Sequence, residues 1–396
     1  MKTNPSNYYE LLTFGLGKDP LAWQQFVNRF QTKYNALQAD GFSWDPEVQL
    51  DYTYEQLQTE LGIATLPIYV DAEAEALDKK LGGFKIGENR IPTQKHRYGL
   101  NTRILREKML MIQKFGQAAM NAEVKNALME LLFESTDKLI AGNRNAITHQ
   151  RMQVVSTGKF TIDAANNPRG LKGITFDFGI VSDAANATTK RWWTSATHTV
   201  ANEGSAADPI EDLKSVVRAK KKEGWPELQI EMAKDLYDDM LTHTAVLKRI
   251  GLASNPLAAS DTTGKVAIQQ ASNMLDDQKG NIIERLVGAP IVTRDTIARA
   301  EEFDASTQAL KFKTVENFKA TNVAFVPKGV LGTIKSVQQL VFADDPTARY
   351  AWFDGGRTLI SQRYDSKTRA TYVESEGAWL TVPNMPQYMT NKVVTA

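Results

Sequence analysis

The feature that most constrains the fold is a long stretch of helical periodicity over residues 121–157. Apolar or small side chains recur there at intervals of three or four, the spacing of one helix face, at Val124, Leu128, Leu131, Ser135, Leu139, Gly142 and Ala146. Gly158 follows at the position of a C-terminal cap. Such a helix is on the order of 50 Å long. We therefore predict a spine helix that is too long for one small domain.

Strand patterns follow the predicted helix directly, at 159–163 and 173–180. Ile174, Phe176, Phe178 and Ile180 alternate along the second run, so one side of this ribbon is expected to be buried against the spine helix.

A second region alternates helices with strands and predicts a mixed α/β subdomain. Asp208 has the features of a helix N-cap, because Pro209 stands at the first helical position and Glu211 follows three residues after the cap. After Gly224 we expect a strand at 228–232, a helix at 234–250 and an exposed loop at 252–265. Strands are expected to dominate from 290 onward, including 322–326, 350–353, 368–373 and 379–382. The fold class predicted for the whole chain is α+β.

The N-terminal region is predicted to form an arm with one amphipathic helix at 20–39. Trp23, Phe26, Phe30 and Tyr34 recur there at helical spacing, and they can pack either on their own subunit or on a neighbour. From 66 to 100, short alternating runs around a glycine pair predict a long two-stranded excursion. A lone hairpin is marginal in water, so the parent domain or a neighbouring molecule must cover it.

Composition and motifs argue against catalysis. The chain has 396 residues, 42% of them hydrophobic, a net charge of +1 and no cysteine, which excludes disulfides and cysteine-based metal sites. Its four histidines are far apart in sequence, and no phosphate-binding loop or serine nucleophile motif is present. We predict no enzyme activity, no catalytic residue, no cofactor and no metal site.

Charge and targeting signals are weak. A basic run at 218–222 ends the helix that follows Asp208, where its cations either complement the helix dipole or contact phosphate. The first residues lack the apolar core of a secretory signal, and no apolar run is long enough to cross a bilayer. We expect a soluble protein made in the cytosol, with no membrane partner.

Several short motifs occur in a characteristic order along the chain. They are Thr157-Gly158-Lys159, Phe176-Asp177-Phe178-Gly179, Trp193, the helix start with Asp208, Pro209 and Asp212, His243-Thr244-Ala245-Val246, and the turn with Pro327, Gly329 and Gly332. This ordered set resembles the lambda-type (gpE-like) major capsid proteins, a branch of the Hong Kong 97 fold of tailed-bacteriophage shell subunits.

The resemblance implies a division of the chain into named parts. It implies an N-terminal arm at 1–67, an extended E-loop hairpin at 68–100 and a peripheral (P) domain with the spine helix at 101–182. An axial (A) domain is implied at 183–340, with C-terminal strands at 341–396 that return to the P-domain and A-domain.

The resemblance also implies self-assembly into pentamers and hexamers that form an icosahedral head around the double-stranded DNA of a tailed phage. The E-loop, with Phe84, Ile86 and Arg90 as inter-subunit residues, is expected to lie over a neighbour's spine region, and the 252–265 loop is a candidate for the ring centre. The near-zero charge suits DNA that is contained through weak local contacts. Portal, scaffolding and decoration proteins are further candidate partners, and the expected location is the virion after assembly in the host cytoplasm.

Two alternatives stay open from sequence. An encapsulin-type nanocompartment shares the fold but encloses a cargo protein, and a soluble enzyme would need a cleft with convergent polar groups. We predict no Lys–Asn crosslink between subunits.

Overall fold

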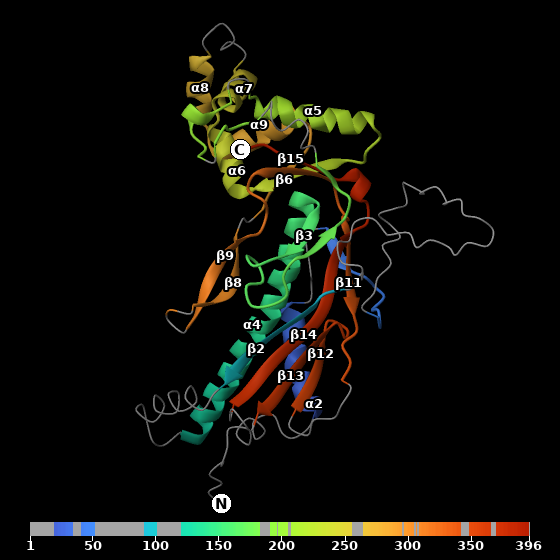
Figure 1. Cartoon of the computed structure of the whole chain (residues 1–396). Helices are drawn as coiled ribbons and strands as arrows, with labels where there is room; N and C mark the ends of the chain where they lie inside the picture. The colour runs from blue at the N-terminus through green and yellow to red at the C-terminus, as the bar shows by residue number, and fades with distance from the viewer. Residues whose placement is uncertain are drawn as a thin grey trace, which may run out of the picture.

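The computed structural model describes residues 20–34, 41–51, 91–100, 120–182, 191–195, 197–204, 207–255, 264–294, 297–304, 306, 309–341, 348–365 and 370–395. Helices and strands are mixed along the chain, and a sheet lies toward each end of one long helix (Figure 1). The α+β prediction is confirmed. The division into arm, E-loop, P-domain and A-domain stays a prediction.

The long helix is α4 (Met120–Thr157), which has 38 residues and a length of about 57 Å. It ends where predicted, because Gly158 adopts a φ of 76° and its N–H donates to the Val154 carbonyl at 2.9 Å. Leu139, Ile147 and Val154 are buried along its length. The sequence periodicity therefore identified both the element and its C-terminal stop.

One sheet has six strands and packs on α4. Its order is β1 (Phe42–Trp44), β11 (Gly332–Val337), β14 (Ala370–Pro383), β13 (Thr358–Asp365) and β12 (Ala348–Phe353), with β2 (Thr93–Leu100) also paired to β14. The prediction of separate strands at 368–373 and 379–382 was wrong, because β14 continues through the polar run between them. That run stays extended because β2 pairs with it from Thr371 to Ala378.

The other sheet has five strands, in the order β5 (Val181–Ser182), β15 (Thr390–Val393), β10 (Asn322–Pro327), β6 (Leu228–Ala233) and β7 (Ile291–Arg294). Helices α5 (Pro209–Lys222), α6 (Lys234–Thr242), α7 (Thr244–Ser254), α8 (Lys265–Ser272) and α9 (Asp276–Val287) gather around it at the end of the molecule away from the six-stranded sheet (Figure 1). β10 is buried along its whole length, as expected for a central strand.

The prediction of one helix at 234–250 was wrong. His243 has an extended backbone, with φ −63° and ψ 131°, and its ring Nδ1 accepts the Ala245 N–H at 3.2 Å. This side-chain cap starts α7 as a new helix immediately after α6. Gly251, expected just beyond the helix, lies inside α7, where an added Cβ would stand 2.1 Å from the Ala267 carbonyl oxygen of α8.

Two small ribbons complete the described strands. β3 (Lys159–Ile162) pairs with β4 (Ile174–Asp177), and β8 (Ile297–Asp304) pairs with β9 (Ala309–Glu316). The predicted strand at 173–180 is shorter than expected, although Phe178 and Ile180 beyond its end are buried as predicted. Short 3-10 helices lie at Val200–Asn202 and Pro386–Tyr388.

The amphipathic N-terminal helix is present as α2 (Pro20–Lys33) and packs on its own chain. Trp23, Phe26 and Phe30 are buried in a cluster with Phe353 and Ile360 of the six-stranded sheet. The Trp23 indole N–H donates to the Ile360 carbonyl at 3.1 Å. Of the two alternatives for these aromatics, the structure shows packing on the parent subunit.

Candidate functional site

The turn motif with Pro327, Gly329 and Gly332 carries the chain from one sheet to the other. Pro327 ends β10, Gly329 has a φ of 105°, and Gly332 begins β11. A Cβ on Gly332 would stand 2.3 Å from both the Val382 carbonyl oxygen and the Phe42 ring, so only glycine fits there. The motif therefore sits at a structural joint.

The second group of motif residues holds the start of α5. The Asp208 carboxylate accepts the Glu211 N–H at 3.1 Å, so the predicted N-cap is confirmed, and Pro209 occupies the first turn. Asp208 also accepts the Arg249 Nε–H of α7 at 2.5 Å. The cap therefore joins two helices as well as starting one.

Asp212, one turn into α5, forms a buried clamp on the end of the chain. Its carboxylate accepts the Trp192 indole N–H at 3.1 Å and forms an ion pair with Lys392 of β15, and both charged groups are buried. The backbone beside Trp192 follows the same terminal segment, since the Trp192 N–H donates to the Val394 carbonyl at 2.7 Å. The clamp fixes the chain's last strand in the five-stranded sheet.

Trp193 lies next to this clamp and packs between two histidines. Its ring stacks on His198 with centroids 4.3 Å apart and meets His243 edge-on at 5.4 Å. His198 pairs with Asp239 at 2.6 Å, whereas burial lowers the pKa of His243 despite the nearby Glu203 carboxylate. These histidines therefore have the packing and capping roles expected of structural residues.

A buried charge cluster that the sequence did not reveal joins α4 to the five-stranded sheet. Arg151 of α4 and Arg294 of β7 both bind the Glu231 carboxylate of β6, with N–O distances of 2.5 Å and 2.9 Å. Arg151 and Glu231 have no exposed side-chain surface. Burial alone would raise the pKa of Glu231, but the two arginines and their hydrogen bonds hold it below its usual range.

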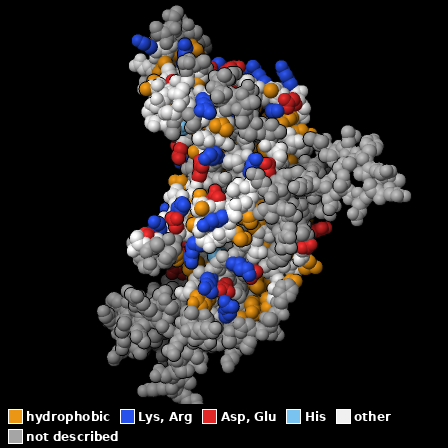
Figure 2. All heavy atoms as spheres, viewed as in Figure 1, with side chains coloured by type: hydrophobic (Ala, Val, Ile, Leu, Met, Phe, Trp, Pro, Cys, Tyr) orange, Lys and Arg blue, Asp and Glu red, His pale blue; other side chains and the backbone are white. Residues whose placement is uncertain are grey.

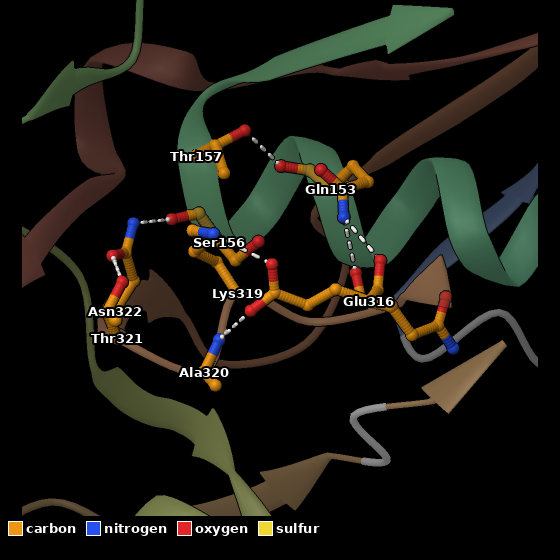
Figure 3. A network of polar contacts seen from close by, with 9 residues as sticks. Gln153, Ser156, Thr157, Glu316, Lys319, Ala320, Thr321 and Asn322 are labelled. Carbon is orange, nitrogen blue, oxygen red and sulfur yellow. Dashed lines mark hydrogen bonds and ion pairs between the residues drawn. The ribbon is translucent and has the colours of Figure 1, made fainter. Parts of the chain in front are cut away.

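The C-terminal end of α4 is fixed by a polar network (Figure 3). Gln153 donates to the Glu316 and Asn317 carbonyls at 2.9 Å and 2.8 Å, and Asn322 donates to the Ser156 carbonyl at 2.8 Å. These hydrogen bonds give partners to backbone carbonyls and to the Gln153 and Asn322 side chains, where helix α4 meets the segment between β9 and β10. The spine helix, the β8–β9 ribbon and the five-stranded sheet thus meet at one rigid point.

Two surface hollows flank β2. One, of about 640 Å³, opens over β2, β12, β13 and β14, where Lys95 pairs with Glu376 and both Arg97 and Arg363 pair with Glu374. Its floor is a ladder of opposite charges in which the basic side chains are exposed and the glutamates are partly buried, which suits a polar contact surface.

The other hollow, of about 490 Å³, lies between β2, α4 and the β3–β4 ribbon. Its lining includes His96, which bonds to Asn143 at 2.8 Å, and His149, which bonds to Asn317 at 3.0 Å. Burial lowers the pKa of both histidines. Within the described ranges, no three His, Asp or Glu side chains come close enough to hold a metal ion.

The basic run at 218–222 ends α5 as predicted, and two of its lysines contact groups of the same chain. Lys220 pairs with Glu223 at 2.9 Å and stands 4.6 Å from the Trp225 ring centroid, and Lys221 donates to the Gly288 carbonyl at 3.2 Å. Both roles considered for the run, complementing the helix dipole and contacting phosphate, stay predictions. On the face seen in Figure 2, basic and acidic side chains are interspersed.

The candidate inter-subunit residues Phe84, Ile86 and Arg90 lie outside the described residues, as does most of the 252–265 loop. In the part of the chain that the structure describes, no helix combines the length and apolar character needed to span a membrane.

The chain matches solved structures. No family model matches the chain, and no curated protein matches it. Among solved structures, a protein described as the capsid protein of an E. coli CFT073 prophage has 10% identity and a TM-score of 0.47, covering 94% of this chain and 98% of that one. The chain is similar to phage capsid structures over nearly its whole length.

Two further structures have similar coverage. A phage-related protein from Bordetella bronchiseptica RB50 has 11% identity and a TM-score of 0.40, covering 95% of this chain and 96% of that one. The satellite phage P4 procapsid has 12% identity and a TM-score of 0.37, covering 94% and 91%.

Proposed function

We propose that this protein is the major capsid protein of a tailed phage, a non-enzymatic subunit that assembles with copies of itself into a shell. The observation that carries the proposal is the place of the ordered sequence motifs in the fold. Asp212 forms the clamp on the terminal strand, Trp193 lies next to it, and Asp208 caps the same helix. Pro327 to Gly332 form the crossing between the sheets. Sequence motifs that fix the joints of a fold are expected in a protein whose function depends on its shape.

The described architecture supports this role physically. An elongated subunit with a sheet toward each end of a 38-residue helix presents much surface relative to its volume (Figure 1). The buried cluster around Glu231 and the network around Gln153 stiffen the joint between helix and sheet. A shell subunit needs such stiffness, because ring contacts close only when every copy has the same shape.

β2, the last part of the predicted E-loop at 68–100, pairs with β14 of the same chain. We further propose that the E-loop segment before β2 links neighbouring subunits through Phe84, Ile86 and Arg90. The hollow between β2, α4 and the β3–β4 ribbon offers an open surface along the spine helix for such a segment. In this proposal, head-to-tail contacts between subunits close into pentamers and hexamers, and the 252–265 loop faces the ring centre. The icosahedral head that these rings form holds double-stranded DNA with weak local contacts. Assembly takes place in the cytoplasm of the bacterial host, and portal, scaffolding and decoration proteins complete the particle.

The proposal is tested by the mass of the purified protein in light scattering as its concentration rises. We expect a steep transition from monomer to particles, because each subunit joins several neighbours at once. A Phe84→Ser, Ile86→Ser double variant should need at least about a tenfold higher concentration, since two apolar contacts are lost. Leu275→Ser is the matched control, because Leu275 is an exposed leucine that lies outside both the E-loop and the hollow proposed to receive it.

A wild-type mass that stays at one or two chains at every concentration would contradict the proposal. Particles that contain a cargo protein and exclude DNA would instead favour the nanocompartment alternative. Unchanged assembly of the double variant, beside normal wild-type assembly, would overturn only the role of the E-loop.

A further inference from the structure

The β8–β9 ribbon presents an apolar face to solvent. Its eight-pair register places Phe312 directly opposite Glu301, so Ile297, Leu310 and Phe312 lie on one face. These three side chains are 61%, 54% and 72% exposed. Among the described strands, β8 and β9 pair only with each other (Figure 1). An exposed apolar face on a two-stranded ribbon is unfavourable in water unless something covers it.

The opposite face of the ribbon is different. Cross-strand pairs stand there between Lys313 and Glu302 at 3.9 Å and between Lys311 and Asp304 at 3.5 Å. Val315, at the base of that face, is buried. The ribbon therefore carries its large exposed apolar side chains on one side, which we call the apolar face.

The ribbon is held in place before any partner arrives. The Gln153 amide of α4 binds the carbonyls of Glu316 and Asn317 at the base of β9, as Figure 3 shows, and the Glu316 carboxylate accepts the Ala320 N–H at 2.8 Å. A surface that is already ordered loses less conformational entropy on binding. The apolar face is thus held in a fixed position relative to the spine helix.

The size of the face indicates what covers it. Two strands of eight residues present a surface of roughly 26 by 10 Å, on the order of 250 Å². A stable interface usually buries about 800 Å² on each partner, so this face is too small to hold an independent partner by itself. It suits one contact among several in a repeated assembly. Exposed Arg299 and Glu301 on the same face also provide opposite charges that an identical face can complement.

We propose that the Ile297, Leu310 and Phe312 face of the ribbon docks on a second copy of this chain; this inference rests on the proposed shell function and adds a contact outside the E-loop. Phe312→Ser should raise the concentration needed for assembly at least about tenfold, because one well-buried aromatic contact is lost at every interface. Phe312→Leu should assemble close to the wild-type concentration. Lys311→Ser, the neighbouring position on the opposite face, is the matched control.

Light scattering against concentration measures the effect, and circular dichroism melting checks that each variant folds. An independent measurement replaces Phe312 with the photocrosslinker benzoylphenylalanine, with the same replacement at Lys311 as control. Irradiated particles should give a band of two linked chains from position 312 and little from position 311. This measurement decides the case if Phe312→Ser fails to fold.

The outcomes separate the two proposals. If the wild type assembles and Phe312→Ser assembles at the same concentration, or if position 312 crosslinks no better than position 311, the ribbon contact is wrong and the shell function stands. If the wild type never assembles, both are wrong.

Discussion

Replacing Glu231 by glutamine is expected to lower the free energy of unfolding by about 3–5 kcal/mol, because Arg151 and Arg294 would lose their buried counter-charge. The midpoint of urea unfolding at neutral pH measures this change. Glu227→Gln is the matched control, since Glu227 lies just before the same strand with its side chain 70% exposed, and its pair with Lys328 is 3.4 Å long. That control should cost less than about 1 kcal/mol.

The difference in unfolding free energy between wild type and Glu231→Gln is expected to depend on pH. The pKa of Glu231 is lower in the folded chain than the ordinary glutamate value of about 4.3. Ionised Glu231 therefore stabilises the fold fully at pH values above about 4.3. This contribution is lost as the pH falls through the folded pKa. The stability gap between wild type and Glu231→Gln should therefore shrink in acid. A gap that is constant with pH, or a control as damaging as the variant, would contradict the role given to Glu231.

Replacing Asp212 by asparagine should also cost about 3–5 kcal/mol of unfolding free energy. The change keeps the shape of the side chain but leaves the buried Lys392 ammonium without a carboxylate. Urea unfolding again provides the measurement, with Glu211→Gln as control because the Glu211 side chain on the same helix is 46% exposed and pairs with Arg249 at 3.3 Å. The control should change stability by less than about 1 kcal/mol.

A second substitution shows whether Asp212 acts through Lys392. The double variant Asp212→Asn, Lys392→Met removes the stranded charge, so it should lose less stability than the two single variants added together. Strict additivity would mean that Asp212 stabilises the fold without Lys392.

Local patterns predicted the elements whose stabilising contacts are near in sequence. The period of the spine helix, Gly158 at its end, and the Asp208-Pro209 start of α5 depend on neighbours within a few residues, and the structure places them as expected. The same reasoning failed at His243, where an imidazole acts as a helix cap, a role for which serine, threonine, aspartate and asparagine are the usual signals.

Long-range contacts explain the remaining features that the sequence predictions got wrong or did not reveal. The run after Val373 resembles a strand break because it is polar, yet Glu374 and Glu376 face Arg97 and Lys95 of β2, which is almost three hundred residues away in sequence. The sequence did not reveal the role of Glu231 either, because its two arginine partners lie 80 and 63 residues away on other elements. A carboxylate between Ile230 and Met232 in a strand buried on both faces is the signal that could have marked it.

Negative-stain electron microscopy of the purified protein is the most direct test of the proposed assembly of this chain into a closed shell. We expect closed particles, or rings of five or six subunits, in the fractions where light scattering reports a large mass. Uniform single chains or dimers at every concentration would contradict it and would reopen the search for an enzymatic site.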